Sequence, residues 1–88
     1  MYVAVIKHPV KDYTTWREVY DSFEPRKAIA TDRDTVIQSL EDPNNVTVIM
    51  HFENLDKANG FLDSAELKAG MQESGVIGIP LVTIGKVD

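Results

Sequence analysis

The segment at residues 2–9 constrains the fold more than any other part of the chain, because it is apolar on both faces of a β-strand. Side chains alternate across a strand, so Val3 and Val5 lie on one face. Ala4 and Ile6 lie on the other. A small domain with one sheet and two helices covers only one face of that sheet, and a second copy of the sheet is the simplest cover for the other. The segment therefore predicts an assembly as well as a fold.

The length and charge of the chain exclude several classes of function. Its 88 residues allow one hydrophobic core, so residues 1–88 are expected to form a single domain. A net charge of −5 argues against binding nucleic acid or an anionic membrane surface. The absence of cysteine removes disulfides, thiolate catalysis and cysteine-based zinc sites. With no long apolar run and no signal-peptide pattern, the expected location is the cytoplasm.

Hydrophobic patterns predict the element order β-α-β-β-α-β. The expected strands are residues 2–9, 35–40, 46–52 and 81–87, and the expected helices are 13–23 and 55–73, the second with a restart near Ser64. This order indicates an α+β, ferredoxin-like fold, with a four-stranded antiparallel sheet and both helices on one face. Right-handed crossovers and a hairpin between the second and third strands give the strand order 4-1-3-2.

Capping residues predict where the helices begin and end. Asp12 is a suitable N-cap for the first helix, and Gly75 is a suitable C-cap for the last. Asp63 with Glu66 resembles a capping box at the restart of the second helix. A proline at position 25 ends the first helix or opens a short continuation over residues 25–30.

The strands also predict which side chains face the helices. The most apolar stripe is the even-numbered set of the third strand, Val46, Val48, Met50 and Phe52, and it is expected to face the helices. The helix-free face is expected to carry Thr47, Ile49 and His51, together with Tyr2, Ala4, Ile6 and His8 of the first strand. The apolar members Ala4, Ile6, Ile37 and Ile49 predict a homodimer through that face.

Three segments carry a resemblance to a known family. They are residues 10–16 after a strand that ends in Lys-His, residues 42–46 at the hairpin, and residues 67–71 with 75–78 near the end. The chain resembles small proteins of the dimeric α/β-barrel superfamily, in its antibiotic-biosynthesis-monooxygenase-like branch. The resemblance implies that two ferredoxin-like subunits pack their sheets face to face into a barrel. It also implies that a ligand lies between sheet and helices or within the barrel.

The resemblance does not extend to the residues of two known activities. Haem-degrading relatives use a histidine on the second helix and an asparagine on the first strand, and neither is present here. Quinone-forming relatives rely on an asparagine and a tryptophan around the cavity, and Trp16, the only tryptophan, does not align with that role. A shared fold does not transfer a reaction. We therefore expect no haem and no other cofactor.

His8 is the candidate catalytic residue, because an unperturbed histidine titrates near neutral pH and can act as a general base. Asp12 or Tyr13 would orient its ring. The alternative is that His8 only forms a hydrogen bond at the strand end. Tyr13 and Trp16 are candidate ligand-binding residues for a flat aromatic molecule, and the alternative is that they belong to the core.

His51 is the third candidate ligand-binding residue, on the barrel-facing side, and its alternative role is structural. His8 and His51 lie toward opposite ends of antiparallel neighbours, so no metal site is expected. Two functions stay open. One is a dimer of unknown role that binds a small ligand or is purely structural. The other is a cofactor-independent monooxygenase or isomerase that acts on a small aromatic or polyketide-like compound.

Overall fold

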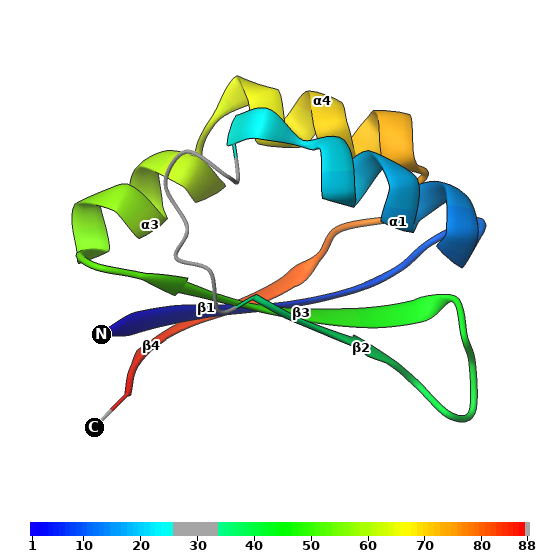
Figure 1. The fold of residues 1–88 in the computed structure, drawn as a ribbon, viewed down its shortest axis with the longest axis horizontal. Helices are drawn as coiled ribbons and strands as arrows, with labels where there is room; N and C mark the ends of the chain where they lie inside the picture. The colour runs from blue at the N-terminus through cyan, green and yellow to red at the C-terminus, as the bar shows by residue number, and fades with distance from the viewer. Residues whose placement is uncertain (26–33, 88) are drawn as a thin grey trace.

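A computed structural model describes residues 1–25 and 34–87 of the chain. Its elements are β1 (Tyr2–Pro9), α1 (Tyr13–Ser22), β2 (Thr35–Gln38), β3 (Asn45–Phe52), α3 (Leu55–Leu62), α4 (Ala65–Ser74) and β4 (Leu81–Lys86). The strands form one antiparallel sheet in the order β2-β3-β1-β4, and the three helices lie on one face of it (Figure 1). The predicted ferredoxin-like fold and strand order are confirmed. No helix among the described residues is long and apolar enough to cross a membrane.

Local capping explains most of the element boundaries. Asp12 caps α1 by accepting a hydrogen bond from the Thr15 backbone N–H at 3.0 Å, as predicted. Gly75 ends α4 at φ 84°, which is the left-handed conformation that glycine adopts without strain. The continuation predicted over residues 25–30 falls largely on residues 26–33, which lie outside the described residues.

Two predictions at element ends are wrong, while the other predicted boundaries agree with the structure to within one residue. Ser64 rather than Asp63 caps α4, because its hydroxyl accepts from the Leu67 backbone N–H, while Asp63 closes α3. β2 ends at Gln38 instead of residue 40, and Leu40 is fully exposed in the turn that follows.

The register of β1 against β3 corrects the predicted faces of the first strand. Ile6 pairs with Val48 and Ala4 pairs with Met50. Directly paired residues of an antiparallel sheet point to the same face. The even-numbered residues of β1, His8 among them, therefore face the helices rather than the helix-free side. The prediction for β3 is confirmed, since Val46, Val48, Met50 and Phe52 are all buried.

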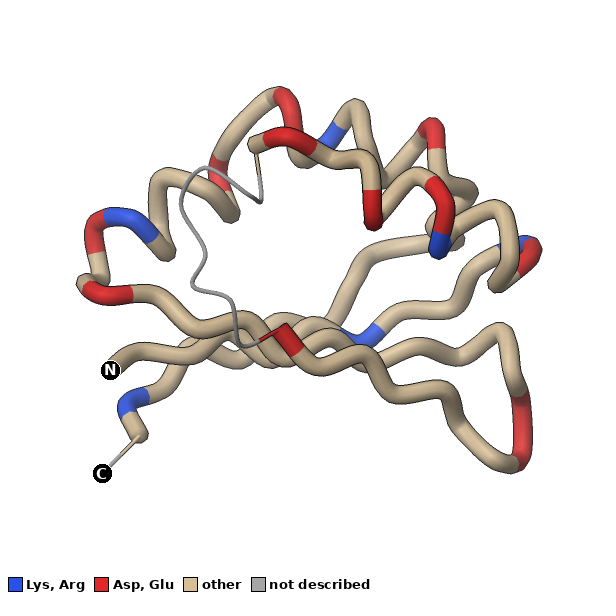
Figure 2. The backbone as a smooth tube through the Cα atoms, in the orientation of Figure 1, with Lys and Arg blue, Asp and Glu red and all other residues tan. Residues whose placement is uncertain are grey.

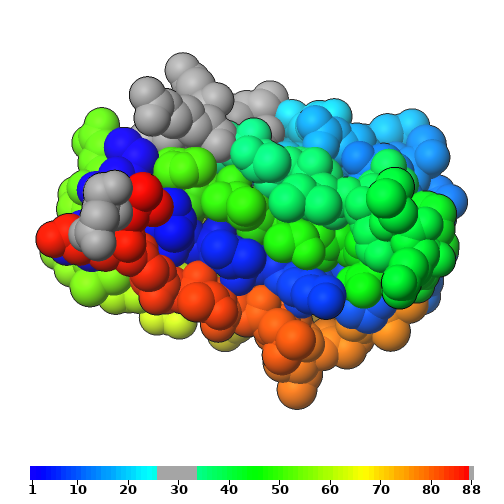
Figure 3. Space-filling view, turned by 90° about the horizontal axis from the view of Figure 1, so that it is seen from below, coloured from blue at the N-terminus to red at the C-terminus, as the bar shows by residue number. Residues whose placement is uncertain are grey.

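The helix-free face of the sheet combines apolar side chains with threonines, His51 and Lys7. Its apolar members are Val3, Val5, Ile37, Ile49 and Leu81, so Val3 and Val5 replace Ala4 and Ile6 in the predicted set. Figure 3 looks onto this face, where the four strands form the centre of the surface. Their sequences contain only two charged residues, Lys7 and Lys86, whereas most charges lie on helices and loops (Figure 2).

Candidate functional site

An apolar cavity lies between the sheet and helices α1 and α4. The centre of a water-sized sphere can occupy about 50 Å³ of this cavity. One side of the cavity is connected to solvent. Its lining comes from β1, β3, α1 and α4, with Phe61 from α3. Because the described residues that line it include no Asp, Glu, Lys or Arg, the cavity provides an uncharged environment.

His8 brings a polar ring into this apolar lining. It pairs with Val46 in the sheet, faces the helices and is only 4% exposed. Within the described part of the chain, its Nδ1 atom has no hydrogen-bond partner. A buried polar atom left unpaired costs about 1–3 kcal/mol. This cost indicates a place for a ligand group or an ordered water molecule.

Burial also determines the charge state of His8. Removal from water lowers the pKa of the imidazole below its ordinary value of 6.5, and a weaker interaction with its own backbone raises it only partly. This interaction is not a hydrogen bond to Nδ1, because Nδ1 has no hydrogen-bond partner among the described residues. His8 is therefore neutral at neutral pH, and a neutral imidazole offers one donor and one acceptor.

Trp16 and Tyr20 form the aromatic wall beside His8. The Trp16 ring meets the His8 ring edge-on at 5.6 Å and stacks on Tyr20 at 5.0 Å. Val19 of α1 and Phe23, the C-cap of that helix, also line the cavity. Tyr13 lies 5.9 Å from Trp16 and packs against the core, but it is not part of the lining.

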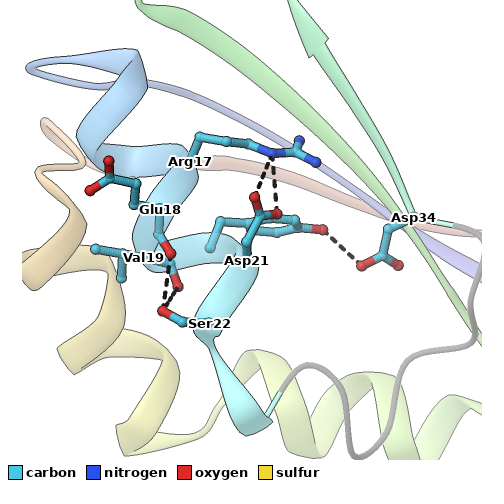
Figure 4. A network of polar contacts seen from close by, with 7 residues as sticks. Arg17, Glu18, Val19, Asp21, Ser22 and Asp34 are labelled. Carbon is cyan, nitrogen blue, oxygen red and sulfur yellow. Dashed lines mark hydrogen bonds and ion pairs between the residues drawn. The ribbon is translucent and has the colours of Figure 1, made fainter.

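The outer end of the aromatic wall is fixed by polar contacts. The Tyr20 hydroxyl donates to Asp34 at 2.8 Å, which joins α1 to the start of β2 (Figure 4). On the exposed side of α1, Arg17 forms an ion pair with Asp21 at 3.1 Å and lies over the Tyr20 ring. Because both groups of that pair are exposed, it adds little stability.

The structure does not support the predicted partners of His8. The Asp12 carboxylate is exposed and accepts from both the backbone N–H and the hydroxyl of Thr15. These hydrogen bonds hold the pKa of Asp12 below its ordinary value. Neither Asp12 nor Tyr13 forms a hydrogen bond to His8 within the described residues. The aromatic contact of the imidazole is with the Trp16 ring, at 5.6 Å between centroids and 60° between planes.

Asn44 positions α1 over the cavity, and sequence reasoning missed its role. Its Oδ1 atom accepts from the Tyr13 backbone N–H at 2.9 Å, and its carbonyl accepts from Val10 at 2.7 Å. The Lys11 backbone N–H donates to the Gly75 carbonyl at 2.9 Å. The hairpin turn between β2 and β3 therefore fixes the first turn of α1, which carries Trp16. An asparagine in a turn was visible in the sequence, but its distant acceptor role was not.

Helix α4 closes the cavity opposite α1, and its contribution was also missed. Gly70, Met71 and Ser74 line the cavity at helical spacing. A Cβ atom on Gly70 would lie 2.8 Å from the Phe23 ring at the end of α1, so a larger residue there would force the ring to move. The spacing of Leu67, Met71 and Ser74 was the only sequence signal for this wall.

His51 is not brought to the cavity. It pairs with Val3, which places it on the helix-free face of the sheet. It is half-buried there, and its Nδ1 atom has no hydrogen-bond partner among the described residues. His8 and His51 therefore lie on opposite faces of the sheet and cannot contribute to one site within a subunit.

The fold is shared with several solved structures. No family model matches the sequence, and no curated protein matches it. An antibiotic biosynthesis monooxygenase superposes with a TM-score of 0.74 over 100% of this chain and 99% of its own, at 7% identity. SnoaB, a cofactor-independent oxygenase from Streptomyces nogalater, superposes at 0.77 over 99% and 92% of the two chains, at 11% identity. A conserved protein from Methanosarcina mazei Go1 superposes at 0.73 over 100% and 94%, at 16% identity. The chain therefore has the fold of the antibiotic-biosynthesis-monooxygenase-like structures, and at these identities the likeness establishes the fold alone.

Proposed function

We propose that the protein binds a small apolar ligand in the cavity between the sheet and helices α1 and α4, and that it does so without a cofactor. The observation that carries this proposal is the buried His8 ring, which has no hydrogen-bond partner for Nδ1 among the described residues and lines an otherwise apolar space. Apolar contact with Trp16 and Tyr20 would contribute favourable binding free energy for a ligand that fills this cavity.

A thermal-shift screen of small aromatic compounds tests this proposal. A ligand present at about 100 times its Kd stabilises the fold by roughly 2.7 kcal/mol, which raises Tm measurably. Hits are located by the indole N–H resonance of Trp16, because the chain contains only this tryptophan and it lines the cavity. If no compound shifts either Tm or this resonance, ligand binding is wrong and the cavity belongs to a purely structural dimer.

A second candidate is a cofactor-independent monooxygenase or isomerase that uses His8 as its base. The neutral imidazole beside the aromatic wall favours it, and SnoaB, which shares the fold, is described as a cofactor-independent oxygenase. Oxygen uptake with hit compounds measures monooxygenase activity, and chromatography of the products measures isomerisation. His8→Ala should abolish turnover and leave the assembly unchanged, while Tm falls because a buried ring is removed. Turnover that survives in this variant would exclude His8 as the base.

The same proposal includes a homodimer formed through the helix-free face of the sheet. Ile37 is 45% exposed and Leu81 is 71% exposed on that face. Burying an aliphatic side chain of this size is worth about 1.5–3 kcal/mol. His51 would then lie between the two sheets, where a ligand role for it stays a prediction.

Light scattering at micromolar concentration measures the mass of the assembly. Ile49→Glu should dissociate the dimer, because Ile49 lies at the centre of the face. Ala69→Glu, on the exposed side of α4, is the matched control and should not. A monomer mass for the wild type would refute the dimer.

Charge supports a second copy and a small molecule as partners rather than nucleic acid. The net charge is −5, and most acidic residues lie on helices and loops (Figure 2). The strands present few charges that would repel the same face of another copy. A cytoplasmic location stays a prediction, which cell fractionation would check.

A further inference from the structure

We infer that the cavity selects a neutral ligand of about one aromatic ring that carries a hydroxyl group, with phenol as the simplest member of the class. The inference rests on the proposed ligand-binding function and adds the charge, polarity and size of the ligand to it. Three features of the cavity carry it: the absence of charged side chains among the described residues that line it, the unpaired Nδ1 atom of His8, and its volume.

The part of the lining that the structure describes favours neutral ligands over charged ones. None of the described residues that line the cavity is Asp, Glu, Lys or Arg. A carboxylate or an ammonium group would lose its hydration on entry and meet no opposite charge. A neutral ligand does not have this cost, so the described lining favours phenol over benzoate.

His8 favours a hydroxyl group on the ligand. The Nδ1 atom of His8 has no hydrogen-bond partner among the described residues, and only 4% of the residue is exposed. The Tyr20 and Ser74 hydroxyls donate elsewhere, to Asp34 at 2.8 Å and to the Met71 carbonyl at 3.2 Å. A neutral imidazole has one donor and one acceptor nitrogen. A hydroxyl both donates and accepts, so it matches either nitrogen, whereas a ketone matches only the donor.

The volume limits the size of the ligand. The space open to water-sized centres is about 50 Å³, whereas an engineered cavity of about 150 Å³ is known to hold benzene. The enclosed part therefore takes the hydroxyl-bearing end of one ring, and the rest of the ring lies in the partly open mouth. The Trp16 and Tyr20 rings supply aromatic surface on one side of the ligand. A fused polycyclic ligand would remain largely outside.

Titration of the wild-type protein with phenol, toluene and benzoate tests the inference. At about pH 8 phenol is neutral and benzoate is charged. The indole N–H resonance and the fluorescence of Trp16 report binding at the cavity. We expect phenol to bind roughly two- to tenfold tighter than toluene, which is the range of one net hydrogen bond. Benzoate should bind at least roughly tenfold more weakly than phenol.

His8→Phe is the matched variant, because it keeps a flat ring and removes both nitrogens. The phenol-to-toluene affinity ratio should fall to about one, while toluene affinity stays within roughly twofold of wild type. Circular dichroism checks that the variant folds. If His8→Phe does not fold, His8→Gln replaces it. This variant keeps a donor and an acceptor, so it should retain the preference for phenol over toluene. The affinities of the wild-type protein for phenol, toluene and benzoate test the inference in either case.

The possible results separate this inference from the proposal on which it rests. Equal wild-type affinities for phenol and toluene would overturn the inference and leave ligand binding intact, because water would then satisfy His8. Benzoate that binds as tightly as phenol would also overturn it. If none of the three compounds perturbs Trp16, both this inference and the proposed ligand-binding function are wrong.

Discussion

Replacing Gly70 by alanine should destabilise the protein, although alanine is the better helix former. Gly70 lies inside α4, where a glycine-to-alanine change alone gains about 1 kcal/mol. Against this gain, the new Cβ would lie 2.8 Å from Cε1 of Phe23 and 3.3 Å from Cδ1 and Cζ. A carbon atom at 2.8 Å forces the ring to move. The Phe23 ring is itself packed edge-on against Phe61 at 6.2 Å, so its movement disturbs the core.

Overpacking of this kind costs about 1–3 kcal/mol, so the net change is between about zero and a loss of 2 kcal/mol. Gly60→Ala is the matched control, because Gly60 lies inside α3 and a Cβ there would meet no atom within 4 Å. That variant should gain the full 1 kcal/mol or so, which raises Tm by roughly 4–8 °C in a domain of this size. Gly70→Ala should leave Tm unchanged or lower it by up to about 16 °C.

Urea unfolding and differential scanning calorimetry of the two variants measure the difference. A double-mutant cycle with Phe23→Leu isolates the contact, since removal of the ring should let Gly70→Ala become neutral or stabilising. If Gly70→Ala raises Tm as much as Gly60→Ala does, the ring does not press on α4. The close approach of α1 and α4 above the cavity would then be wrong.

Two further predictions concern the candidate site. Burial lowers the pKa of His8 in the folded protein, so the unfolded chain binds the proton first and stability should fall as pH drops below about 6.5. The unfolding free energy should fall by at most about 1.4 kcal/mol per pH unit, down to the pKa of His8 in the folded protein. Urea unfolding of His8→Phe at several pH values should show a weaker pH dependence. The same pH dependence in both proteins would exclude His8 as its cause. Asn44→Ala removes the acceptor of the Tyr13 N–H and should cost about 1 kcal/mol, whereas Asn59→Ala, on the exposed face of α3, should change stability by less than about 0.5 kcal/mol. Equal effects of these two substitutions in thermal unfolding would show that Asn44 does not anchor α1.

The sequence alone determined the elements and their order, because these depend on neighbours along the chain. The stripe from Val46 to Phe52 identified the buried face of β3, since only one of its faces is consistently apolar. Asp12 and Gly75 identified two helix ends because capping is a contact over a few residues. The one cap assigned to the wrong residue, at Ser64, differs by a single position.

The tertiary structure decided which face of β1 is buried, and with it the environment of His8. Both faces of β1 are apolar, so alternation cannot choose between them, and a shift of one residue exchanges them. The choice is made by hydrogen bonds to β3, about 40 residues away in the chain, which pair Ile6 with Val48. The cavity likewise depends on the approach of α4 to Phe23 at Gly70, a contact between residues 47 positions apart. Such contacts form only when the whole sheet and both helix layers pack together, so no local pattern contains them.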